Sequence, residues 1–175
     1  MSREIYIGID NGVTGSVGII VHCDRDGISN SFFGTPSFVE QSYVKAKKNR
    51  SRIDTRKLRA NIRKVYDYKD ESHSIYCLLE RPMINGMRFQ ASISAACAME
   101  AMMITLERLK VPIVWIDSKE WQKVLLPSGI KGGPDLKRVS AKVGCKLFPK
   151  LKKPILEQED ADGLLIAEYC RRFYR

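Results

Sequence analysis

Short runs of apolar residues alternate along the chain with longer stretches in which apolar residues recur every three or four positions. The short runs predict buried β-strands at about residues 4–10, 16–21, 29–35, 75–80 and 111–116. The longer spacing predicts helices at about 54–66, 90–110, 118–126, 134–147 and 159–173. Strands and helices are mixed, and neither an internal repeat nor a linker divides the 175 residues. We therefore expect one α/β domain over residues 1–175.

Residues 36–53 follow neither pattern. They are rich in Lys, Arg and Ser and have no clear hydrophobic period. We expect a mobile basic loop here, inserted into the domain.

Positive charge is concentrated in two parts of the chain, whose net charge is +10. Lys45 to Lys69 holds 11 Lys and Arg against 2 Asp and Glu, and Lys119 to Lys153 holds 10 against 2. Such segregation favours a polyanionic partner over the alternative, a merely solvated surface. A membrane surface is disfavoured, because no basic amphipathic helix carries an aromatic face.

Cysteine usage and hydropathy exclude several classes of protein. The five cysteines are scattered and never form a C-x-x-C pair, which argues against a disulfide framework and a zinc site. No apolar run reaches the roughly 18 residues of a membrane span, and the first residues lack the regions of a signal peptide. We expect an intracellular, cytoplasmic protein without a membrane partner.

Three carboxylates occupy positions where a purely structural protein rarely places one. Asp10 and Glu80 each end an apolar strand, and Asp162 lies within the apolar stripe of the last predicted helix. Glu159 precedes Asp162 by one helical turn and would share its face. Taken singly, Asp10 could be a turn residue, Glu80 could form an ion pair at the strand end, and Asp162 could interact with the helix dipole. Together they predict four carboxylates at one point.

Such a cluster predicts a site for divalent cations, which relieve the mutual repulsion of carboxylates. Mg²⁺ prefers carboxylate oxygens, and Mn²⁺ is the alternative. The two histidines, His22 and His73, lie in no motif, which argues against zinc chemistry. Two Mg²⁺ ions roughly 4 Å apart can cleave a phosphodiester by activating a water and stabilising the leaving 3′ oxygen. The basic segments would hold the nucleic-acid strands on either side.

Three motifs resemble those of RuvC-type Holliday-junction resolvases, in the same order along the chain. Ile7-Gly8-Ile9-Asp10-Asn11-Gly12 with Thr14-Gly15 resembles the first motif, and Leu79-Glu80-Arg81-Pro82 resembles the second. Asp162-Gly163-Leu164-Leu165-Ile166-Ala167 resembles the last, which is usually D-A-L-x-I-A. The compact chain and the basic insertion are more similar to phage-type members.

This resemblance implies the RNase H-like fold, with a central mixed five-stranded sheet flanked by helices. It implies a homodimeric, Mg²⁺-dependent crossover-junction endodeoxyribonuclease that acts on branched DNA, above all four-way junctions. The family's four metal-binding acids map onto Asp10, Glu80, Glu159 and Asp162. The family commonly has Asp where this chain has Glu159, so Asp160 is a competitor. In a continuous helix, however, Asp160 would point away from the face of Asp162.

The resemblance also implies roles in DNA contact. A basic residue near the scissile phosphate could be Lys131 or Lys137, and a side chain that wedges into the opened junction could be Met83, with Arg88 and Phe89 close behind. Ordinary loop and helix-start packing is the alternative for this last group. The remaining expected DNA contacts are Lys47, Lys48, Arg50, Arg52 and Arg81.

Three other readings of the same residues stay open. An actin-like or sugar-kinase-like ATPase shares an I-G-I-D-x-G-x-T loop, but that fold needs two such domains, so we expect no nucleotide cofactor. A catalytically silent nucleic-acid-binding module would have no need of the acids. An RNase H-like nuclease acting on flaps or RNA–DNA hybrids remains an alternative, since fold does not fix substrate.

Overall fold

The computed structural model describes residues 3–42, 49–65, 73–130 and 132–174. The strands are β1 (Arg3–Ile9), β2 (Ser16–Cys23), β3 (Gly27–Gly34), β4 (Ser37–Gln41), β5 (Asn49–Ile53), β6 (His73–Glu80) and β7 (Val114–Ile116). The α-helices are α1 (Thr55–Arg63), α2 (Phe89–Arg108), α3 (Ser118–Leu125), α4 (Gly133–Leu147), α5 (Lys152–Gln158) and α6 (Asp162–Phe173). Two 3₁₀ turns, η1 (Gly86–Arg88) and η2 (Pro149–Leu151), precede α2 and α5.

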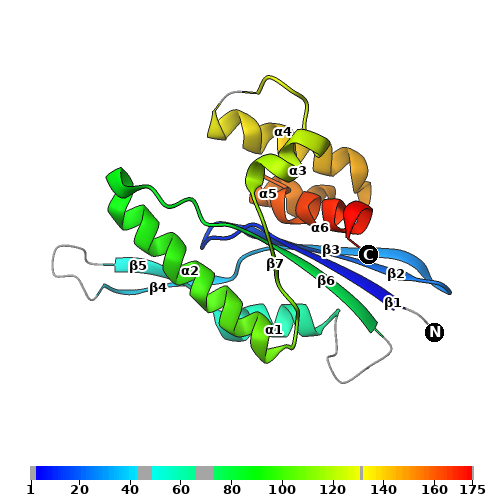
Figure 1. The fold of residues 1–175 in the computed structure, drawn as a ribbon, viewed down its shortest axis with the longest axis horizontal. Coiled ribbons are helices and arrows are strands. Elements are labelled where there is room, and N and C mark those ends of the chain that lie inside the picture. Colours follow the sequence, from blue (N-terminus) through cyan, green and yellow to red (C-terminus); the bar gives the residue numbers. More distant parts are fainter. Residues whose placement is uncertain (1–2, 43–48, 66–72, 131, 175) are drawn as a thin grey trace.

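Five strands form one mixed sheet in the order β3-β2-β1-β6-β7. The first three strands run antiparallel to one another, whereas β6 pairs in parallel with both β1 and β7. Helices cover the two faces of this sheet (Figure 1). The predicted α/β architecture with a mixed five-stranded sheet is therefore confirmed.

A hydrophobic core lies on each face of the sheet, because successive side chains of a strand point to opposite sides. Ile5, Ile7 and Ile9 of β1 belong to a core shared with α1 and α2. Tyr6, between them in sequence, belongs to the other core, which α3, α4, α5 and α6 cover. Buried apolar side chains form both cores, mostly aliphatic in the first and including Tyr6, Trp121 and Phe148 in the second, so the central strand is packed on both sides.

Helix α6 lies directly on β1 and β2 because glycines face it. A Cβ atom on Gly8 would collide with the backbone of α6 at Gly163 and Ala167, and a Cβ on Gly18 would collide with Leu164. Without these side chains, the backbone of α6 approaches the sheet closely. This brings the first residue of α6, Asp162, toward the end of β1.

The structure corrects the expectation of a loop over 36–53. Residues 37–41 and 49–53 are strands that pair antiparallel as a separate two-stranded sheet of β4 and β5. Most of their side chains are exposed, so the sequence shows no one-sided apolar alternation. Glu40 lies directly opposite Arg50, and this cross-strand pair of opposite charges stabilises the hairpin.

The structure also corrects the start of the last helix. Residues 152–158 form a separate short helix, α5, and its C-cap residue Glu159 has a left-handed backbone with φ of 66°. Helix α6 begins only at Asp162. The three residues from 159 to 161 therefore do not follow helical spacing, and the prediction of a helix from 159 was wrong.

Helix α2 is more exposed than the expected packed helix. Ala98, Met102 and Leu106 are buried against the sheet, but only 28% of the most apolar 18-residue stretch within Gly86–Arg108 is buried. By length and composition alone, Gly86–Arg108 could cross a membrane, contrary to the expectation that no segment is long and apolar enough. Core helices of soluble proteins commonly have the same length and apolar composition.

Candidate active site

Carboxylates from three elements meet at one edge of the central sheet. Asp10 directly follows β1 and Glu80 ends β6, and these two strands are parallel neighbours, so their carboxyl ends lie side by side. Asp162 begins α6, which packs across β1. Oxygen atoms of Asp10, Asp160 and Asp162 all lie within 4.8 Å of one another. The sheet edge thus gathers the acids that the strand ends predicted, together with Asp160.

Asp160 occupies the position that the sequence had assigned to Glu159. The argument for Glu159 assumed helical spacing up to Asp162, and that assumption fails because α6 starts at Asp162. Asp160 is fully buried within the cluster. Glu159 is exposed at the end of α5 and lines a separate basic hollow with Lys142. The geometry therefore favours Asp160 as the fourth acid.

Neutral hydrogen-bond donors from neighbouring elements hold the acids in place. Ser16 donates its hydroxyl to Asp160 Oδ1 over 3.2 Å, and Ser140 donates to Asp162 Oδ1. Each hydroxyl also accepts a backbone N–H: Ser16 from Gly163 and Ser140 from Ala161. The two serines are buried, and they tie the short connection before α6 to β2 and α4.

Glu80 is held by the indole of a buried tryptophan. Trp121 of α3 donates from Nε1 to Glu80 Oε2 over 3.0 Å, and its ring is fully buried. The bond fixes one carboxylate oxygen of Glu80. Helix α3 therefore contributes to the site without contributing an acid.

Lys137 is the cation that contacts the cluster in the described part of the chain. Its Nζ lies 3.1 Å from Asp160 Oδ2, and its side chain is half-exposed. Burial alone would lower the pKa of Lys137, but the hydrogen bond and charge of Asp160 outweigh it and raise the pKa. The residue thus remains an ammonium that faces both the acids and solvent.

Burial and mutual repulsion disfavour ionisation of the acids in the protein alone. Burial, followed by the charges of Glu80 and Asp162, raises the pKa of Asp10 well above its usual range. Burial raises the pKa of Glu80 to about 7, although the Trp121 hydrogen bond opposes it. Burial also raises the pKa of Asp162 to about 6, against the hydrogen bond from Ser140. The cluster therefore holds more negative charge than its protein surroundings neutralise.

The donor set fits a divalent cation of the Mg²⁺ or Mn²⁺ kind. The converging atoms are carboxylate oxygens, the ligands that such hard cations prefer, and no His or Cys belongs to the described group. Asp10, Asp160 and Asp162 could hold one ion, and Glu80 lies close enough to raise the pKa of Asp10 by its charge.

The turn after Asp10 is fastened on both sides. Gln158 of α5 donates from Nε2 to the carbonyls of Thr14 and Gly15, at 3.0 and 3.2 Å. On the other side, Asn11 donates to the carbonyl of Ala95 in α2.

The sequence analysis identified none of the residues that position the acids or the turn: Ser16, Ser140, Trp121 and Gln158. A buried Ser or Trp carries no pattern that distinguishes it from an ordinary core residue.

Three of the predicted DNA-contacting or catalytic lysines, Lys47, Lys48 and Lys131, lie outside the described residues. Arg50 and Arg52 are on β5, and both pair with Glu40. Arg81 pairs with Asp117 and lies over the ring of Trp115.

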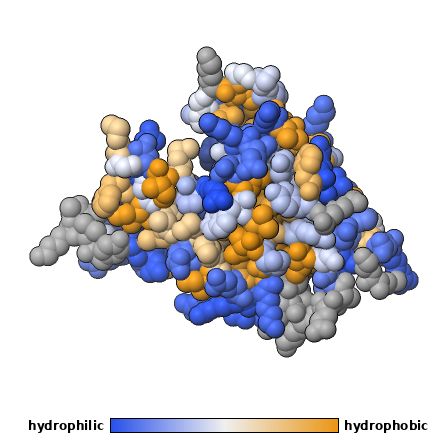
Figure 2. All heavy atoms as spheres, in the orientation of Figure 1, coloured by the Kyte–Doolittle hydropathy of each residue, from blue (hydrophilic) through white to orange (hydrophobic). Residues whose placement is uncertain are grey.

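The predicted wedge residues are exposed before and at the start of α2. Met83 and Phe89 are 82% and 64% exposed, and Met87 between them is 96% exposed. Arg88, the N-cap of α2, is exposed as well. Hydrophobic residues gather on the surface over this end of α2 (Figure 2). The packing alternative for Met83 and Phe89 is therefore not supported in this chain.

Comparison with known proteins identifies the fold. No protein-family model matches the sequence, and no curated protein matches it significantly. Among solved structures, the chain is similar to Thermus thermophilus RuvC in complex with a Holliday junction substrate. The TM-score is 0.54 and the identity 16%, over 97% of this chain and 96% of that one. A second structure of Thermus thermophilus RuvC matches with a TM-score of 0.49 and 14% identity, over 96% of each chain. The first of these matches, which spans nearly the whole of both chains, shows the RNase H-like fold that the motif resemblance implied.

Proposed function

We propose that this protein is a divalent-metal-dependent endonuclease that cleaves branched DNA, resolving Holliday junctions. One observation carries the proposal: the oxygens of Asp10, Asp160 and Asp162 converge within 4.8 Å at the sheet edge of an RNase H-like fold. Such a cluster is costly for folding unless it serves a cation. Structural similarity to a RuvC that binds a Holliday junction substrate supports the choice of DNA.

In this proposal the acids hold Mg²⁺ or Mn²⁺, and the protein supplies the geometry. Asp10, Glu80, Asp160 and Asp162 are the metal ligands, and Ser16, Ser140 and Trp121 orient three of them. When bound, the metal supplies an activated water and stabilises the leaving oxygen. Lys137 contacts Asp160 from a half-exposed position, where its ammonium could neutralise a phosphate at the site. Lys131 is the alternative for this role.

The DNA contacts and the dimer belong to the same proposal. Met83 and Phe89 would insert at the opened branch point, with Arg81 and Arg88 on nearby phosphates. Lys47, Lys48, Arg50 and Arg52 would bind phosphates of an arm. A homodimer would place two such sites on two strands of one junction, so that both are cut.

A cleavage panel tests the proposal. Labelled four-way junction, flap, duplex and RNA–DNA hybrid are incubated with the protein in Mg²⁺, in Mn²⁺ and in EDTA. We expect junction cleavage that requires metal and is lost in Asp10→Asn and Asp162→Asn, while both variants still bind the junction. Preferential cleavage of hybrid or flap would favour the alternative substrates, and undiminished cleavage by both variants would refute the site.

The fourth acid is tested by a matched pair of neighbouring substitutions. Asp160→Asn removes a buried charge from the cluster, whereas Glu159→Gln removes an exposed one. We expect Asp160→Asn to abolish cleavage and Glu159→Gln to retain most of it. The reverse result would restore the assignment that the sequence suggested.

A further inference from the structure

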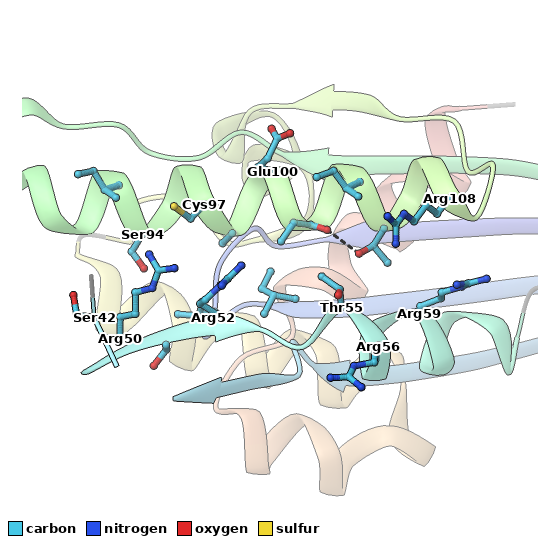
Figure 3. Close-up of a pocket in the computed structure, with 18 of the residues that line it drawn as sticks. Ser42, Arg50, Arg52, Thr55, Arg56, Arg59, Ser94, Cys97, Glu100 and Arg108 are labelled. Carbon is cyan, nitrogen blue, oxygen red and sulfur yellow. Dashed lines mark hydrogen bonds between the residues drawn. The ribbon is translucent and has the colours of Figure 1, made fainter. Parts of the chain in front are cut away.

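A groove of about 640 Å³ lies between α2 on one side and β5 with the start of α1 on the other (Figure 3). Apolar side chains line part of it, among them Ile53, Ile93 and Ile104. Five arginines also line it: Arg50, Arg52, Arg56, Arg59 and Arg108. The groove therefore combines an apolar surface with a high density of guanidinium groups.

Three of these arginines have no acidic partner among the residues that the structure describes. Arg50 and Arg52 pair with Glu40, but Arg56, Arg59 and Arg108 form no ion pair with any described residue. The Nε of Arg59 is shielded from solvent and has no hydrogen-bond partner among the described atoms. Glu100 is the one acid in the lining, and its carboxylate points away from the arginine side chains in Figure 3. The groove thus favours an anionic occupant.

The groove begins beside the proposed active site. Val13 lines it and lies three residues after Asp10, on the turn that Asn11 fastens to α2. From Ser94 to Arg108, the wall formed by α2 extends for about 21 Å at 1.5 Å per residue. A chain that leaves the acid cluster past Val13 would meet the groove directly.

The combination of charge and apolar lining selects among possible occupants. A second copy of this chain, packed by twofold symmetry, would place the same arginines against each other, which is repulsive. A DNA duplex presents phosphates but keeps its base faces stacked inside, away from the isoleucines. A single strand offers both phosphates and unstacked bases to one groove.

We propose that this arginine groove binds single-stranded DNA that continues from the active site. Its phosphates would contact Arg56, Arg59 and Arg108, and its sugars and bases would lie against Ile53, Ile93 and Ile104. The inference rests on the proposed function, since the strand is taken to be one that is unpaired beside the branch point. The groove would thereby select junctions with separated strands over continuous duplex.

Two triple variants test the groove: they remove the same positive charge, one inside the groove and one outside it. The triple variant Arg56→Gln, Arg59→Gln, Arg108→Gln is compared with Arg25→Gln, Lys57→Gln, Lys64→Gln, whose residues do not line the groove. Affinity for labelled oligothymidylate is measured in EDTA at several salt concentrations. If three phosphate contacts are lost, the slope of log affinity against log salt becomes shallower by about 2, and affinity at 0.1 M salt falls about a hundredfold. We expect a much smaller change in the control.

Cys97 provides a direct measure of occupancy. This thiol is exposed and lines the groove, whereas the partly exposed Cys23 does not line it. Maleimide labelling of each cysteine, read by peptide mass spectrometry, should be slowed at Cys97 and unchanged at Cys23 when oligothymidylate is added. Labelling is carried out in EDTA and does not depend on cleavage. If the protein fails to cleave DNA but oligothymidylate still protects Cys97, the proposed function is refuted and the binding of a strand in the groove is not.

Four results would overturn the inference. Equal loss of affinity in the two triple variants would show that only total charge matters. Unchanged Cys97 labelling in saturating oligothymidylate would place the strand elsewhere. Protection by polyglutamate but not by DNA would assign the groove to an acidic protein, and protection that grows with protein concentration alone would assign it to a second copy.

Discussion

Replacing Glu80 by Gln should stabilise the metal-free protein at neutral to alkaline pH, although Glu80 lies in the proposed active site. The glutamine keeps an oxygen that can accept the hydrogen bond from Trp121, so the change removes mainly a charge. That charge is largely buried near Asp162 and Asp10, which repel it. A residue kept for metal binding should therefore oppose folding when no metal is present.

The pKa of Glu80 gives the size and the pH range of this effect. A carboxyl whose pKa is raised on folding favours the folded state at low pH and loses that advantage as pH rises. The loss runs from the unfolded value near 4.5 to the folded value of about 7, and the difference corresponds to about 3 kcal/mol. For a chain of this length, that corresponds to about 6 to 12 °C in melting temperature. Below pH 4.5 the wild type and the variant should differ little from this cause.

Thermal melts in EDTA at pH 8 and pH 4.5 test this reasoning, with the exposed Glu107→Gln as a control. We expect Glu80→Gln to melt higher than the wild type at pH 8 and the control to match the wild type. Added Mn²⁺ should raise the wild-type melting temperature and affect Glu80→Gln less, because ligands that bind only the folded state stabilise it. An unchanged or lower melting temperature of Glu80→Gln at pH 8 would refute the argument that burial, with repulsion from neighbouring acids, destabilises the charged Glu80.

Three further substitutions test how the fold supports the site. Trp121→Phe and Ser140→Ala each remove a donor to an acid, and we expect Mn²⁺ affinity, measured by calorimetry, to fall by about 10- to 100-fold. Gly8→Ala places a Cβ against the backbone of α6 and should cost about 3 kcal/mol in urea unfolding, whereas Gly86→Ala, with open space around it, should be nearly neutral. Glu168→Gln should lower stability by about 2 kcal/mol at pH 7, because buried Glu168 pairs with Arg171 and Arg172. Burial opposes ionisation of Glu168, but these hydrogen bonds lower its pKa. The stabilisation by Glu168 is therefore present above the pKa of the unfolded state and is lost as pH falls through the pKa of the folded state. An equal loss of stability in Glu168→Gln at pH 7 and pH 3 would contradict this.

The predicted convergence of Asp10, Glu80 and Asp162 agrees with the structure, because acids that interrupt or end apolar segments leave a clear signal. Asp10 and Glu80 each follow an uninterrupted apolar run, and parallel pairing of β1 and β6 brings their ends together. Asp162 interrupts an apolar stripe that the structure confirms as buried over Leu165 and Ile166. In each case, a charged residue contradicts the local hydrophobic pattern, and that contradiction is visible without coordinates.

Glu159 was preferred to Asp160 as the fourth acid because helical spacing was extended through residues that are not helical. Glu159 takes a left-handed backbone conformation, so Asp160 turns into the cluster and Glu159 turns out. Periodicity cannot reveal such a break, since a three-residue gap between short helices leaves no period of its own.

The hairpin of β4 and β5 was missed for a related reason. Its side chains are mostly exposed on both faces, so no face shows apolar alternation. Its stability comes instead from pairing across the strands, as between Glu40 and Arg50. Such pairing is evident only once the register is known.

The residues that donate hydrogen bonds to the acids come from elements far apart in sequence. The geometry of the site therefore depends on how these elements pack on one face of the sheet. Ser16 comes from β2, Trp121 from α3 and Ser140 from α4, and each donates to an acid on another element. These donors are neutral, so they fix the carboxylates in space while leaving most of their charge uncompensated. Gly144 of α4 packs so closely on Ala161 that a Cβ there would collide with it, which keeps Ser140 within reach of Asp162. Substitutions at such contacts should therefore weaken metal binding without touching an acid, since they displace the donors that aim the acids at one point.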